Sequence, residues 1–135
     1  MRLLGIDYGD KYTGLAISDA KPSLAVAKDI VYGKTRQDLS KYMQEIITQE
    51  GIDVVVVGMP LGLDGQPTQQ TKKTAKFVEW LRTVLSVPVE VMDERMTTGA
   101  FRAEHKGSAR PQRDDAQAAR ILLQNYIDRH YDNHR

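Results

Sequence analysis

The most constraining segment of the chain is residues 52–58, which read Ile-Asp-Val-Val-Val-Val-Gly. A run of valines this uniform does not alternate between apolar and polar side chains, so it is typical of a central strand that is covered on both faces. β-branched residues also favour strands over helices. The segment therefore predicts a sheet with helices packed on both of its faces.

The rest of the chain supplies the neighbouring strands and the covering helices. Short apolar segments predict strands at 2–8, 13–18, 25–32 and 87–92. Apolar residues that recur every three or four positions predict helices over 35–50, ending near Gly51, over about 69–85, over about 97–106 and over 113–130. Three antiparallel strands come first and helices then alternate with strands, so we expect an α/β fold with a mixed five-stranded sheet.

Composition limits the classes of protein to which the chain can belong. It has 135 residues, with 19 basic and 18 acidic side chains and no cysteine. This size fits a single domain over residues 1–135, and the near balance of charge means that any nucleic-acid-binding face must be local. The lack of cysteine excludes disulfides and thiolate metal sites. No apolar run approaches a membrane span or a signal-peptide core, so we expect a cytoplasmic protein with no membrane partner.

Acidic residues fall at three places that the predicted fold could bring together. Asp7 lies in the first strand, where a carboxylate is disfavoured unless something compensates its charge. Asp93 and Glu94 follow the last strand, and since adjacent residues face opposite ways, only one of them can readily face Asp7. Asp115 is expected in the first turn of the last helix, on the same side as the small residue Ala119. The sequence leaves the choice between Asp93 and Glu94 open.

Convergent carboxylates, without a cysteine or histidine cluster, would form an oxygen-only site suited to Mg²⁺ or Mn²⁺. Such ions activate water and stabilise leaving oxygens in phosphate chemistry. Each acid also has an ordinary structural explanation. Asp7 can cap the turn at Gly9, Asp93 or Glu94 can be a solvated strand end, and Asp115 can interact with the helix dipole.

Basic residues are concentrated just before the last helix. The stretch from 95 to 113 has one acidic residue, Glu104, and five basic ones, which are Arg95, Arg102, Lys106, Arg110 and Arg113. We expect this stretch to bind a nucleic-acid backbone beside the carboxylates. The alternative is an ordinary solvated basic helix and loop.

Four blocks of sequence carry a resemblance to a known family. They are Gly5-Ile-Asp7-Tyr-Gly9-Asp-Lys11 with residues 14–19, Val57-Gly58-Met-Pro60 continuing to Gly65, Asp93-Glu94-Arg95-Met-Thr97-Thr98, and Asp115-Ala-Gln-Ala118-Ala119 continuing to Asp128. In this order they resemble the YqgF/RuvX family, whose members are described as pre-16S ribosomal RNA nucleases and as Holliday junction resolvase-like proteins. The blocks span nearly the whole chain.

The resemblance implies an RNase H-like, three-layer α/β/α fold and a divalent metal held by Asp7, by an acid of the Asp93-Glu94-Arg95 motif and by Asp115. Of the two motif acids we expect Glu94 to be catalytic, with Asp93 as the second choice. It also implies that Lys11, Arg95 and Thr98 contact the phosphate backbone. The chain departs from the family pattern at Tyr12-Thr13 and in a shorter segment at 106–113.

We therefore expect a metal-dependent nuclease that trims the 5′ end of the small-subunit ribosomal RNA precursor, with the ribosome as a further partner. A branched-DNA endonuclease uses the same carboxylates and is the alternative, and the sequence does not choose between a monomer and a homodimer. A third possibility is a non-catalytic nucleic-acid-binding module of ribosome assembly. The Asp7-x-Gly9 pattern also resembles the phosphate loop of actin-like ATPases, but those proteins need two such lobes and this chain is too short.

Overall fold

The computed structural model describes residues 1–93 and 111–131. Its elements, in chain order, are β1 (Leu3–Asp7), β2 (Tyr12–Ser18), β3 (Ala25–Tyr32), α1 (Arg36–Glu50), β4 (Val54–Met59), α2 (Gln69–Val84), β5 (Val89–Asp93) and α4 (Pro111–His130). The expected helix over about 97–106 lies outside the described residues. Among the described helices, none is long and apolar enough to cross a membrane.

The strands form one mixed sheet in the order β3-β2-β1-β4-β5. β1 pairs antiparallel with β2, and β2 pairs antiparallel with β3. β4 runs parallel to both β1 and β5. The sequence prediction of a mixed five-stranded sheet that begins with three antiparallel strands is confirmed.

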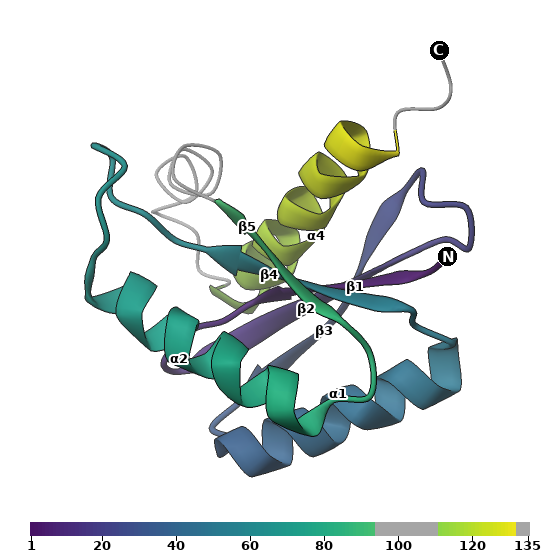
Figure 1. The fold of residues 1–135 in the computed structure, drawn as a ribbon, viewed down its shortest axis with the longest axis horizontal. Coiled ribbons are helices and arrows are strands. Elements are labelled where there is room, and N and C mark those ends of the chain that lie inside the picture. Colours follow the sequence, from purple (N-terminus) through teal and green to yellow (C-terminus); the bar gives the residue numbers. More distant parts are fainter. Residues whose placement is uncertain (94–110, 132–135) are drawn as a thin grey trace.

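Helices cover both faces of the sheet, with α1 and α2 on one side and α4 on the other (Figure 1). The valines of β4 explain why. Val55 and Val57 are buried in the core beneath α1 and α2, whereas Val54 and Val56 belong to the core beneath α4. The uniformly apolar run is therefore a central strand with a core on each face, as predicted.

Local sequence signals set the helix ends. The Thr35 side chain accepts a hydrogen bond from the Asp38 backbone N–H and caps α1, and Gly51 ends that helix in the left-handed conformation. Thr68 and Thr71 form a reciprocal capping box at the start of α2. The two N-caps lie after the carboxyl ends of β3 and β4, so α1 and α2 both begin at the carboxyl edge of the sheet.

Candidate active site

Asp7 is the last residue of β1 and lies opposite Gly14 of β2. Along β1, Leu4 and Ile6 are buried beneath α1 and α2, while Leu3 is buried beneath α4. Alternation along the strand therefore places Asp7 on the α4 face, where it is half-buried. Asp7 therefore faces away from Leu4 and Ile6.

Helix α4 lies against this face in the direction opposite to β1. Its C-terminal end reaches the start of β1, where the Tyr131 hydroxyl lies 2.9 Å from the Met1 sulfur. Further back, Leu123 packs directly on Gly5, because a Cβ added at Gly5 would lie 2.9 Å from the Leu123 Cβ. The N-terminal half of α4 therefore lies toward the end of β1 that bears Asp7.

The rise per residue of α4 and of β1 gives the position of residue 115 along the sheet. Counted from the contact between Leu123 and Gly5, four helical residues span about 6 Å and two strand residues about 6.6 Å. Ala119 therefore lies roughly level with Asp7. Ala119 is fully buried against the sheet. Asp115 lies one turn before Ala119, in the second turn of α4 rather than the first, because the helix begins at Pro111 instead of 113.

The register of β5 places Asp93 on the opposite face. Val57 pairs with Val91 and Met59 pairs with Asp93, so Asp93 follows the side of the sheet that α1 and α2 cover. The α4 side of β5 is marked by Glu90, whose carboxylate accepts a 2.5 Å hydrogen bond from the Tyr126 hydroxyl. Burial and this bond raise the pKa of the Tyr126 phenol. Asp93 is an exposed strand end on the face away from Asp7.

The structure places only part of the predicted set. Lys11 is exposed in the turn between β1 and β2, four residues from Asp7. Asp115 and Arg113 lie in the first two turns of α4. The remaining predicted residues, Glu94, Arg95, Thr98, Arg102, Lys106 and Arg110, lie outside the described residues. Among the side chains that the structure describes, which do not include those of residues 94–116, no three acidic or histidine side chains come close enough to hold a metal ion.

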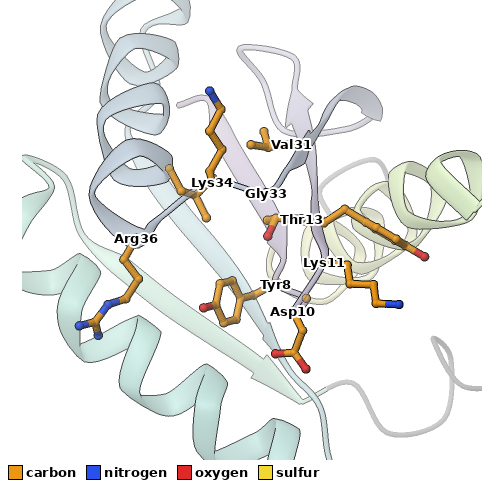
Figure 2. Close-up of a pocket in the computed structure, with 11 residues that line it drawn as sticks. Tyr8, Asp10, Lys11, Thr13, Val31, Gly33, Lys34 and Arg36 are labelled. Carbon is orange, nitrogen blue, oxygen red and sulfur yellow. The ribbon is translucent and has the colours of Figure 1, made fainter.

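A hollow beside Lys11 was not expected from the sequence. It is lined by residues of the β1–β2 turn and of the β3–α1 junction, among them Lys34 and Arg36 (Figure 2). The only sequence signal was two basic residues flanking the Thr35 cap. The hollow forms because the Gly33 N–H donates to the Lys11 carbonyl and joins the two turns, a contact that the sequence does not predict.

Comparison with known proteins is consistent with this arrangement. The model of the family described as "RuvX: Holliday junction resolvase" matches residues 1–129. The chain belongs to this family. The resemblance seen in the sequence blocks is thereby confirmed.

Relatives match along nearly their whole length. A protein of Dictyoglomus turgidum is 37% identical over 95% of this chain and 94% of its own, and one of Caldanaerobacter subterraneus subsp. tengcongensis is 39% identical over 95% and 96%. Both are named "Putative pre-16S rRNA nuclease". The structure of Thermus thermophilus RuvC in complex with a Holliday junction substrate matches with a TM-score of 0.59 at 15% identity, over 97% of this chain and 96% of that one. This likeness confirms the RNase H-like fold.

Proposed function

We propose that this protein is a divalent-metal-dependent nuclease that hydrolyses phosphodiester bonds in precursor ribosomal RNA and trims the 5′ end of the small-subunit RNA. The observation that supports it most is the position of Asp7. This carboxylate lies at the carboxyl edge of the sheet, on the face along which α4 brings position 115 to within about one helical turn. Family membership and the names of the relatives support the same reaction class.

Asp7, Glu94 and Asp115 are the proposed ligands of Mg²⁺ or Mn²⁺. Their donor set is entirely carboxylate oxygen, which suits these hard ions. A bound ion would lower the pKa of an attacking water and stabilise the leaving oxygen. Asp93 is the less suitable motif acid, because its register puts it on the face away from Asp7.

The chain's own residues would bind and align the substrate. Lys11, in the turn that follows Asp7, and the basic residues at 95–113 are proposed to neutralise backbone phosphates on either side of the scissile bond. Such contacts position the strand without selecting its sequence. Buried residues on the same face of the sheet, such as Leu3 and Leu123, pack β1 against α4 and so hold the strand that bears the carboxylate in place.

Cleavage of branched DNA is a second candidate, because the family description itself names a Holliday junction resolvase. The same carboxylates would serve either substrate. Symmetric cutting of a four-way junction would favour a homodimer, whereas end trimming needs only one copy. The substrate assay must therefore include both nucleic acids.

The test is cleavage of an end-labelled precursor ribosomal RNA and of a synthetic four-way DNA junction, with Mg²⁺, Mn²⁺ or EDTA. The variants are Asp7→Asn, Glu94→Gln and Asp93→Asn. Asp128→Asn is the matched control, since Asp128 is exposed near the far end of α4. Loss of a direct metal ligand should exceed the roughly 10- to 100-fold effect of losing an outer-shell partner. We expect that loss for Asp7→Asn and Glu94→Gln and a smaller effect for Asp93→Asn.

Metal-dependent RNA products that Asp7→Asn abolishes would support the proposal. Products from the junction alone would favour the resolvase reaction. If Asp7→Asn cleaves both substrates as fast as Asp128→Asn does, the nuclease proposal is wrong. The chain would then be better described as a nucleic-acid-binding assembly module.

A further inference from the structure

A small hollow lies on the α1/α2 side of the carboxyl edge, away from the face of Asp7. Its floor contains the buried side chains of Thr13, Val31 and Leu39. Three exposed cationic residues, Lys11, Lys34 and Arg36, surround it, and we call them the basic rim. Figure 2 shows their side chains leaving the residues that line the hollow in three different directions.

Backbone contacts hold the two halves of the basic rim together. The Gly33 N–H donates a 3.2 Å hydrogen bond to the Lys11 carbonyl, which ties the β3–α1 junction to the β1–β2 turn. Gly33 has a φ of 58°, a left-handed conformation that favours glycine. Lys34 therefore leaves this junction from a fixed backbone position beside Lys11.

The charge at the hollow is strongly positive. The one acidic residue in its lining is Asp10, and the Lys73 ammonium lies 3.2 Å from the Asp10 carboxylate. Among the described residues, no carboxylate forms an ion pair with the basic rim. Arg36 is further oriented by the Trp80 ring, whose centroid lies 5.0 Å from the guanidinium carbon. An anion at the hollow would therefore lie near cations that no acid of the described residues neutralises.

The hollow is large enough for a small anionic group. Its volume of about 40 Å³ is room for roughly three water molecules. The oxygens of one phosphate group fit in that space. The polar floor residue Thr13 adds a hydroxyl that can donate to such an oxygen.

We propose that the basic rim binds one backbone phosphate of the nucleic acid, at a position that flanks the cleaved bond. This inference rests on the proposed function for its partner, and it adds a binding site on the second face of the sheet. The nucleic-acid strand would pass from the Asp7 face over the β1–β2 turn and would contact Lys11 as it crosses that turn. Lys34 and Arg36 would then hold the phosphate that lies on the α1/α2 side.

The experiment measures binding of a short fluorescein-labelled single-stranded RNA by fluorescence anisotropy, across KCl concentrations. All proteins carry Asp7→Asn and are assayed without divalent ions, so that the RNA stays intact. The test variant adds Lys34→Gln and Arg36→Gln. The matched control adds Lys21→Gln and Arg129→Gln, which remove the same charge from exposed positions outside the hollow. Circular dichroism checks that each variant is folded.

One single-strand phosphate contributes about 0.7 to the slope of log affinity against log salt concentration. We expect this slope to be smaller by about 0.7 in the test variant than in the Asp7→Asn parent. The test variant should then bind roughly fivefold more weakly than the parent at 0.1 M salt and roughly twofold more weakly at 0.4 M. The control should keep the parent slope. An unchanged slope in the test variant would overturn the proposal, and a loss of about 1.4 would also overturn it, because two phosphates would then be bound separately.

Failure of this inference can be told apart from failure of the proposed function. If cleavage depends on Asp7 but the salt slope does not change when Lys34 and Arg36 are replaced, the nuclease proposal stands and only the phosphate-site proposal is wrong. If RNA binding depends on the basic rim but the wild-type protein cleaves neither substrate, the phosphate-site proposal stands and the nuclease proposal is wrong.

Discussion

The contact between Gly5 and Leu123 gives a direct way to move α4 relative to Asp7. In Gly5→Ala the new Cβ would lie 2.9 Å from the Leu123 Cβ and 3.4 Å from both Leu123 Cδ atoms. Ordinary carbon contacts are about 3.5 Å or longer, so the helix must retreat by roughly 0.6 Å. A rotamer change cannot relieve the clash, because the Leu123 Cβ is fixed to the backbone.

The expected cost combines two opposing effects. Overpacking a core typically costs about 1 to 3 kcal/mol, and replacing glycine restricts the unfolded chain and returns about 0.4 to 1 kcal/mol. The free energy of unfolding should therefore fall by about 1 to 2 kcal/mol, which lowers the Tm by roughly 4 to 7 °C for a chain of this size. Because α4 also bears Asp115, displacement of reacting groups should slow cleavage by about 10- to 100-fold.

Thermal unfolding and metal-dependent cleavage of the RNA precursor are measured on the same preparations. Gly51→Ala is the matched control, because it strains the left-handed C-cap of α1, where an added Cβ meets no atom within 4 Å. It should cost about 1 to 2 kcal/mol but leave the cleavage rate of the folded protein unchanged. Adding Leu123→Ala to Gly5→Ala should not rescue activity, since alanine keeps the clashing Cβ. A Gly5→Ala protein with wild-type Tm and wild-type cleavage would refute the packing argument.

Two further predictions concern pH. Hydrogen bonds from the Ser23 hydroxyl and backbone N–H lower the pKa of Asp19 from 3.8 to about 2, so its contribution to stability is present above pH 3.8 and is lost as the pH falls toward 2. Asp19→Asn should remove that part of the acid dependence in urea unfolding, and an identical pH profile would contradict the assignment. The hydrogen bond to Asp29 raises the pKa of Tyr42 from 10.0 to about 12, so stability should decline between those values, where only the unfolded state has lost the proton. Tyr42→Phe should flatten this alkaline decline, and a decline of equal size would show that other groups cause it.

Much of the fold could be predicted because the decisive signals are local. The apolar run of β4 required a core on each side, and both cores are present. Element ends differed where proline intervenes. β5 begins at Val89 rather than 87, because Pro88 has no N–H and takes part only through its carbonyl, which accepts from Val55. α4 begins at Pro111 rather than 113, since proline is favoured at the first helical position.

The candidate site was less accessible from sequence, because its geometry depends on pairing between distant elements. Alternation showed that Asp93 and Glu94 face opposite ways, but only the register of β5 against β4 shows which side Asp93 takes. Apart from flanking the Thr35 cap, Lys34 and Arg36 have no distinguishing pattern, since their proposed role depends on a hydrogen bond between two turns. Most of the predicted basic contacts lie at residues 94–110, outside the described residues, and their roles remain predictions.

The β1–β2 turn links the two proposed sites mechanically. Gly9 permits this turn, because a Cβ there would lie 2.5 Å from the Tyr12 carbonyl oxygen, a backbone atom that cannot move aside. The three residues after Asp7 therefore form a tight connection to Lys11, whose carbonyl accepts a hydrogen bond from the Gly33 N–H. A phosphate held by the basic rim would thus be placed at a fixed offset from the Asp7 carboxylate. Such an offset would let a nuclease without sequence-specific contacts select the bond it cleaves by its distance along the backbone.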